Sequence, residues 1–166
     1  MKSIKVRKLS VEAFHKFGSY GTMISPDAEA TGPKDATIVF YRDMVQQEIF
    51  GANPNYSTLQ VKPRPQVIEY GEYHNNTCEV MMPLNGDAII WAAPADCSDH
   101  VPVEKIEAFY VPQGTLLCLR PGVWHHAPYA VGKKALDVLI VLPERAYAKD
   151  LICYAIPKAD QRKIVS

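Results

Sequence analysis

The stretch Glu72 to Gly86, EYHNNTCEVMMPLNG, decides the fold predicted for this chain of 166 residues. Glu72 and His74 are two residues apart, so a β-strand would place both side chains on the same face. The run Asn75-Asn76-Thr77 favours a turn, and Glu79 then opens an apolar segment that ends at Asn85-Gly86. Asn-Gly is a strong signal for a short hairpin. The pattern therefore predicts a β-hairpin that presents polar side chains on one face of a sheet.

A second stretch, Arg120 to Pro128 with the sequence RPGVWHHAP, predicts another hairpin. Pro121-Gly122 is typical of a turn, and His125 follows three residues after the glycine. We expect His125 to reach the same face as His74 and Glu79. Imidazole and carboxylate groups are the types that bind a divalent metal or transfer protons.

The spacing of both stretches resembles the two motifs of the cupin superfamily. Glu72-x-His74-x4-Glu79-x6-Gly86 is similar to the first motif except for its leading glycine and its first histidine, whose place Glu72 takes. Gly122-x2-His125 is similar to the second motif, which departs here by adjacent Pro121 and Gly122 and by the missing final asparagine. The resemblance implies an all-β fold, a single-domain cupin-like β-barrel of the jelly-roll type. It also implies that His125 faces the interior, so His126 and Trp124 face the other way.

More narrowly, the chain resembles the ureidoglycolate lyase family, formerly called ureidoglycolate hydrolase. The resemblance rests on Glu72-Tyr73-His74, on Pro83-Leu84-Asn85-Gly86 and on the segment from Val123 to Pro128. It covers most of the chain and implies the cleavage of ureidoglycolate into glyoxylate and urea. Glutamine is common in that family where this chain has Glu79, which strengthens the case for a charged oxygen ligand here.

Composition excludes several classes of function. Lys and Arg total 18, Asp and Glu total 18, and nothing in this balance favours nucleic acid or a membrane surface as a partner. The amino terminus lacks the apolar run of a signal peptide. The four cysteines, Cys78, Cys97, Cys118 and Cys153, form no Cys-x-x-Cys pair, so we interpret them as reduced thiols in a cytoplasmic protein. The chain has no glycine-rich phosphate loop, no Gly-x-Ser-x-Gly and no His-Glu-x-x-His.

Short strands separated by turn signals fill most of the chain, which is typical of a barrel or a sandwich. We expect one domain over residues 1–166 with its core at about 57–142. Residues 1–9 predict an edge strand. Ser10 is a good N-cap for a short helix over residues 12–17. Further strands are expected at 20–24, 36–43, 57–61, 66–70, 79–84, 87–92, 105–111, 115–119, 136–142 and 151–156, and residues 161–166 are expected to be frayed.

The candidate site residues divide into three groups. Glu72, His74, Glu79 and His125 are candidate ligands of zinc, manganese, iron or nickel, or else hydrogen-bond one another at the mouth of a metal-free barrel. Glu79, His125 and His74 are the candidate catalytic residues, with Glu79 or His125 as base, His74 as ligand or acid, and Glu72 orienting His74 or completing the metal shell. Arg120, Trp124 and Glu72 are candidates for binding the substrate, because an arginine can hold a carboxylate with two hydrogen bonds. Arg64 and Lys62 are expected to be surface charges.

Three functions remain open from the sequence. The first is a ureidoglycolate lyase-like enzyme acting on a small-molecule substrate. The second is a metal-dependent isomerase, epimerase or lyase for a sugar or a small hydroxy acid, because one fold supports many reactions. The third is a cupin that binds a small molecule without turnover. We expect a homodimer, since apolar strands without edge protection favour association.

Overall fold

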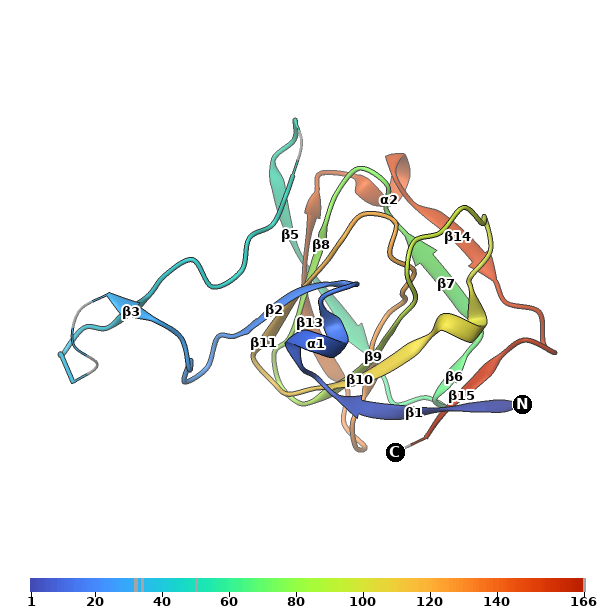
Figure 1. Cartoon of the computed structure of the whole chain (residues 1–166), viewed down its shortest axis with the longest axis horizontal. Helices are drawn as coiled ribbons and strands as arrows, with labels where there is room; N and C mark the ends of the chain where they lie inside the picture. Colours follow the sequence, from blue (N-terminus) through green and yellow to red (C-terminus); the bar gives the residue numbers. More distant parts are fainter. Residues whose placement is uncertain (32, 34, 50, 166) are drawn as a thin grey trace.

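A six-stranded mixed sheet and a five-stranded antiparallel sheet form the body of the protein (Figure 1). The computed structural model describes residues 1–31, 33, 35–49 and 51–165. The six-stranded sheet has the order β12-β9-β10-β1-β15-β6. It contains β1 (Lys2–Lys8), β6 (Val67–Ile68), β9 (Ala88–Ala92), β10 (Glu107–Val111), β12 (Tyr129–Ala130) and β15 (Arg162–Val165). The five-stranded sheet has the order β2-β11-β8-β13-β5. It contains β2 (Gly18–Thr22), β5 (Pro54–Val61), β8 (Glu79–Pro83), β11 (Thr115–Leu119) and β13 (Leu136–Pro143).

The remaining elements are short. Strands β7 (Tyr70–Tyr73) and β14 (Ile152–Ala155) pair with each other, as do β3 (Ala30–Thr31) and β4 (Phe40–Tyr41). The segment that carries β3 projects away from the barrel (Figure 1). The helices are α1 (Val11–Phe14), α2 (Ala146–Lys149) and a 3-10 turn at Val103–Lys105. Within the described ranges, no helix has the length and apolar character needed to cross a bilayer.

The core explains why the central strands are apolar. Met81 of β8 and Leu117 of β11 pack in one cluster with Ile90 of β9 and Phe109 of β10, between the inner faces of the two sheets. The opposite face of β9 is buried as well, with Trp91 in a second cluster beside Trp124. A strand buried on both faces needs a continuous apolar run, and all five residues of β9 are buried. The predicted all-β barrel with a short amino-terminal helix is confirmed.

The amino-terminal helix closes one side of this core. The Ser10 hydroxyl accepts a hydrogen bond from the Ala13 backbone N–H at 3.3 Å, which confirms the predicted N-cap. Phe14 and Phe17 are fully buried, and both rings pack edge-on against Phe109. The helix itself ends at Phe14, three residues earlier than expected.

Several local predictions were wrong. The expected edge strand at the amino terminus is an interior strand, because β1 pairs in parallel with both β10 and β15. The expected frayed end is β15, paired with β1 and β6. The Asn85-Gly86 turn joins β8 to β9 across the two sheets instead of forming a hairpin, since β8 pairs with β11 and β13 while β9 pairs with β10 and β12. The second expected hairpin, at residues 120–128, is also absent from the described residues. The strand before it, β11, pairs with β2 and β8, and His125 bridges to Glu72 instead.

Candidate active site

Backbone hydrogen bonds join the two sequence motifs at one end of the barrel. The Glu72 N–H donates to the His125 carbonyl at 2.8 Å, and the His125 N–H donates to the Glu72 carbonyl at 2.9 Å. The Gly122 N–H donates to the His74 carbonyl at 2.7 Å. These bonds hold the loop after β11 against the end of β7, so that residues about fifty positions apart in the sequence share one site.

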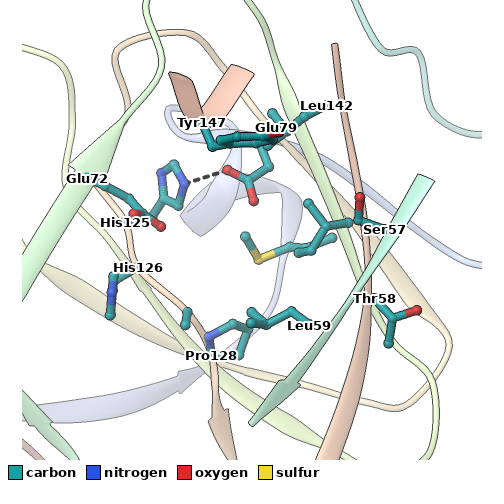
Figure 2. Close-up of a pocket in the computed structure, with 13 residues that line it drawn as sticks. Ser57, Thr58, Leu59, Glu72, Glu79, His125, His126, Pro128, Leu142 and Tyr147 are labelled. Carbon is teal, nitrogen blue, oxygen red and sulfur yellow. Dashed lines mark hydrogen bonds and ion pairs between the residues drawn. The ribbon is translucent and has the colours of Figure 1, made fainter. Parts of the chain in front are cut away.

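Three buried side chains converge there. The Glu79 Oε2 atom lies 2.7 Å from His125 Nε2 (Figure 2). The same oxygen lies 3.2 Å from His74 Nε2. The three side chains offer ligand atoms that all lie within 4.8 Å of one another. Relative exposures of 5% for His74, 7% for Glu79 and 3% for His125 exclude most bulk water from the group.

The outer nitrogen of each imidazole is fixed by a backbone carbonyl. His74 Nδ1 donates to the Asp150 carbonyl at 2.5 Å, and His125 Nδ1 donates to the Val123 carbonyl at 2.8 Å. A carbonyl only accepts, so both Nδ1 atoms carry a proton. On a neutral ring each Nε2 atom would then present a lone pair to the Glu79 carboxylate, which is repulsive unless a proton or a metal cation lies between them.

This donor set fits a divalent metal. Two imidazole Nε2 atoms and one carboxylate are common ligands of zinc, manganese, iron and nickel. The backbone hydrogen bonds to the outer nitrogens are the usual means of orienting histidine ligands. Glu72, predicted as a fourth ligand, lies outside the group of three. The Asp150 carbonyl, rather than Glu72, accepts the Nδ1–H hydrogen bond of the His74 ring, and the role of Glu72 in a metal shell stays a prediction.

The electrostatics of the group are strongly coupled. Burial raises the pKa of Glu79, but the charges and hydrogen bonds of His125 and His74 outweigh burial and lower the Glu79 pKa to about 2. Burial lowers the pKa of His125, and the Glu79 carboxylate reverses this to give a raised pKa; the pKa of His74 is raised in the same way. Glu79 is therefore ionised at neutral pH.

The pKa of Glu72 is displaced in the opposite direction, above its usual value. Burial is the main cause of its raised pKa, and the negative charge of Glu79 raises the pKa further, while His125 and His74 lower it. Two carboxyl groups at one site thus have pKa values displaced in opposite directions. This is a common arrangement where one carboxylate holds charge and the other transfers a proton.

A cavity of about 290 Å³ opens beside these groups (Figure 2). Its polar lining includes Glu72, Glu79, His125 and His126. The remaining lining residues are Ser57, Thr58, Leu59, Met81, Ala127, Pro128, Ile140, Leu142 and Tyr147. Among the described residues that line it there is no lysine or arginine. Positive charge within this lining is therefore limited to its histidines or to a cation held beside them.

Two predicted substrate-binding residues lie elsewhere. Arg120 has the same strand parity as Cys118, whose side chain packs on the outer face of the five-stranded sheet, so Arg120 lies beside a different hollow with Cys78 and Cys118. Trp124 is 1% exposed, packs on Tyr73 with ring centroids 4.5 Å apart, and is paired through its backbone with Ala93. Neither of these substrate-binding candidates lines the cavity of Glu79, and the buried position of Trp124 agrees with the parity that faces it away from His125.

Four residues near the site were not assigned to it from the sequence. His126, expected to face away, lines the cavity, because regular strand alternation ends at the His125 bridge. Tyr147 and Asp150 belong to the α2 region, where the sequence has no motif. Arg64 is also close, since its guanidinium donates to the Ala127 carbonyl at 2.7 Å and stacks 4.2 Å from the Tyr129 ring centroid.

Solved structures of oxalate decarboxylase from Bacillus subtilis resemble the fold, among them one studied for its Mn(II) centres and one studied for its substrate binding mode. Each of these two is 16% identical over 63% of this chain and 24% of the other chain, with a TM-score of 0.46. The structure of the same enzyme at pH 4.6 is 16% identical over 55% of this chain and 22% of the other, with a TM-score of 0.43. This chain therefore spans about a quarter of the length of those proteins.

Sequence comparison identifies the family. No curated protein matches the chain. The model of the ureidoglycolate lyase family matches residues 1–160, nearly the whole length. The predicted resemblance is confirmed, and this chain belongs to the ureidoglycolate lyase family.

Proposed function

We propose that this protein cleaves ureidoglycolate into glyoxylate and urea in the cavity beside Glu72 and Glu79. Family membership supports this reaction class. The observation that carries the proposal is the pair of carboxyl groups in one cavity with opposite pKa displacements, lowered for Glu79 and raised for Glu72. The reaction needs one group that stays charged and one that exchanges a proton, and this pair supplies both.

The reaction moves one proton from oxygen to nitrogen. Ureidoglycolate carries a hydroxyl group and a urea nitrogen on the same carbon. In the proposed mechanism the Glu72 carboxylate accepts the hydroxyl proton, the oxygen electron pair forms the carbonyl of glyoxylate, and the pair of the breaking C–N bond remains on nitrogen. Glu72 then returns the proton to that nitrogen, and urea leaves. The raised pKa makes Glu72 a stronger base than an exposed glutamate.

The group of His74, Glu79 and His125 holds the negative end of the substrate. With both imidazoles protonated and Glu79 ionised, the three side chains carry a net positive charge next to the cavity. If a divalent metal is bound, His74 Nε2, His125 Nε2 and the Glu79 carboxylate hold it, and it supplies positive charge for the substrate carboxylate and the developing carbonyl oxygen. The sequence hypothesis that Glu79 is the base is revised, because a carboxylate with a pKa of about 2 is a weak base.

The test is a direct assay on protein purified without chelator. Metal content is measured first, and glyoxylate release from ureidoglycolate is then followed for the purified, the chelator-treated and the metal-supplemented protein, with zinc, manganese, iron and nickel each supplied. We expect glyoxylate and urea in equal amounts. Release of neither product under any of these conditions would contradict the proposal.

A second candidate is a metal-dependent isomerase, epimerase or lyase for a sugar or a small hydroxy acid. Glu79 favours it, because a fully charged oxygen ligand stands where the family often has glutamine. The same protein is assayed on a panel of sugars and hydroxy acids. Turnover there without glyoxylate release would select this candidate, and tight binding without turnover would select a small-molecule-binding protein.

We also propose that the protein works as a cytoplasmic homodimer. The projecting segment around β3 and β4 exposes Ile24, Ile38 and Phe40, with relative exposures of 55%, 85% and 64%. Such apolar side chains favour burial against a second copy. All four cysteines are free, as suits a reducing compartment. Light scattering is expected to give twice the 18.5 kDa mass of one chain, and a single species at the monomer mass would contradict the dimer.

A further inference from the structure

Asp150 lies directly behind the site, where the last residues of α2 meet the turn after β7. Strand β14 pairs with β7 so that Ile152 is opposite Tyr73 and Cys153 is opposite Glu72. The continuation of this pairing brings Asp150 alongside the turn at residues 74–76. Asp150 also terminates α2, since its N–H donates to the Ala146 carbonyl at 2.8 Å.

The Asp150 side chain holds the backbone of this turn. Its Oδ1 atom accepts from the Asn75 N–H at 2.9 Å and from the Asn76 side-chain amide at 3.0 Å. Its Oδ2 atom accepts from the Asn76 N–H at 2.8 Å. Hydrogen bonds to a charged carboxylate are stronger than neutral ones. Both carboxylate oxygens thus fix the chain immediately after His74.

The Asp150 backbone holds the His74 ring itself. Its carbonyl oxygen accepts from His74 Nδ1 at 2.5 Å, which leaves Nε2 directed at Glu79 Oε2, 3.2 Å away. Apart from its contact with Glu79, the His74 ring has no other hydrogen-bond partner within the described part of the chain. His125 is held independently by the Val123 carbonyl. The two histidines of the site are therefore oriented by different parts of the molecule.

We infer that Asp150 is a positioning residue: its carboxylate clamps the turn at Asn75 and Asn76 so that its own carbonyl sets the tautomer and direction of the His74 ring. Asp150 also joins the site to α2, whose Tyr147 lines the same cavity (Figure 2). The inference deepens the proposed function, because it concerns the side chains assigned to that reaction. The orientation of His74 does not depend on which substrate the cavity accepts.

The experiment compares Asp150→Ala and Asp150→Asn with the wild-type protein. Replacement by alanine removes every acceptor of the clamp, whereas asparagine keeps one oxygen acceptor. Asp96→Ala is the matched control, because the Asp96 carboxylate also caps a turn, accepting from the Ser98 N–H at 2.9 Å, but lies in the loop before the 3-10 turn. The first readout is the pair of imidazole ¹⁵N chemical shifts of each histidine at alkaline pH, which distinguish an Nδ1–H ring from an Nε2–H ring. The second is the affinity for Co²⁺ added alone.

The expected result is specific to one histidine. In Asp150→Ala the His74 shifts move toward a mixture of tautomers, while the His125 shifts remain those of an Nδ1–H ring. Co²⁺ affinity falls by about 10- to 100-fold, as for other losses of a group that orients a metal ligand. Asp150→Asn gives a smaller change of the same kind, and it is the variant to interpret if Asp150→Ala does not fold. Asp96→Ala leaves both readouts unchanged.

Two outcomes would overturn the inference. One is His74 shifts in a folded Asp150 variant that match the wild-type protein. The other is an equal disturbance of His74 and His125, which would mean that Asp150 supports the fold as a whole. Neither readout requires ureidoglycolate, so a failure of the proposed reaction would leave this result interpretable.

Discussion

At the scale of single residues, Glu79 determines the charge of the site. Its carboxylate is the one negative group that touches both imidazoles, at 2.7 Å and 3.2 Å. Glutamine would keep the shape and one oxygen acceptor but remove the charge. Such a replacement would therefore test the charge of Glu79 separately from its shape.

Glu79→Gln is expected to weaken metal binding while the protein stays folded. A unit charge about 4 Å away is worth roughly 4 kcal/mol at an effective dielectric constant of 20, so bound metal after dialysis should fall at least tenfold. The conserved side-chain volume limits the loss of stability. Metal content and circular dichroism are measured together, with the exposed Glu144→Gln as control. Full occupancy in Glu79→Gln would show that this charge has no part in metal binding.

His126 gives a prediction for pH. Burial, helped by the charges of Arg64 and His125, lowers its pKa to about 4, from 6.5. The unfolded chain then binds more protons than the folded chain between these pH values, so the contribution of His126 to stability is complete above pH 6.5 and is lost as the pH falls through 4.

Replacement of His126 by asparagine removes this contribution. The free energy of unfolding of wild-type protein minus that of His126→Asn is expected to decrease steadily from pH 7 to pH 4, which denaturant titrations would measure. The matched control is His15→Asn, since His15 is exposed on the helix side of the barrel. A difference that stays constant over this range would mean that His126 is not buried in its neutral form.

At the scale of elements, close contact between β2 and β11 depends on Gly18. A Cβ atom at Gly18 would lie 1.9 Å from the backbone carbonyl oxygen of Cys118, which cannot move as a flexible side chain would. Gly18→Ala is therefore expected to displace the start of β2 and to destabilise the protein by about 1–3 kcal/mol or more, as overpacking does.

Gly86→Ala is the matched control for this prediction. A Cβ atom at Gly86 would meet Leu136 Cδ1 at an ordinary 3.7 Å, although Gly86 is the glycine that fits the first cupin motif. Thermal unfolding of both variants is compared with that of the wild-type protein. Equal melting temperatures for the two variants would contradict the steric argument.

The elements also show how far the sequence predicts the fold. Thr115–Leu119 is a strand with the predicted bounds, because its apolar run lies between two turn signals. The sequence predicted the pairing of the strands less well than their positions. Asn85-Gly86 has the local preference of a hairpin, but β8 and β9 bury their apolar faces in different sheets. Strands β1 and β15 pair with each other from opposite ends of the chain, and their other partners, β10 and β6, are also distant in sequence, so no local pattern encodes such pairing.

The sequence predicted the charged residues at the centre of the site, but not the residues that surround them. His74, Glu79 and His125 have a motif spacing, and the structure brings them together. Arg120 and Trp124 were placed by nearness in sequence, and the alternation of side chains directs both of them away from the cavity. Asp150 and Tyr147 reach the site through the pairing of β14 with β7, which only the folded chain provides.

At the scale of the whole molecule, the barrel supplies a mainly apolar cavity with buried charged groups at one end. The inner sheet faces exclude water from one side, and α2 carries Tyr147 to the rim (Figure 2). Exclusion of water strengthens every charge interaction in the cavity. In the proposed mechanism two tasks are divided between Glu79, whose pKa is lowered, and Glu72, whose raised pKa suits proton transfer.

The most direct test of this separation is the steady-state rate of glyoxylate release from ureidoglycolate by wild-type protein and by Glu72→Gln. Glutamine cannot accept the hydroxyl proton, and loss of a general base typically costs 10²- to 10⁴-fold in rate. We predict a fall of that size in kcat with KM changed little, because His74, Glu79 and His125 still hold the substrate. A kcat within a few fold of the wild-type value would contradict the assignment of Glu72 and, with it, the mechanism proposed for this cavity.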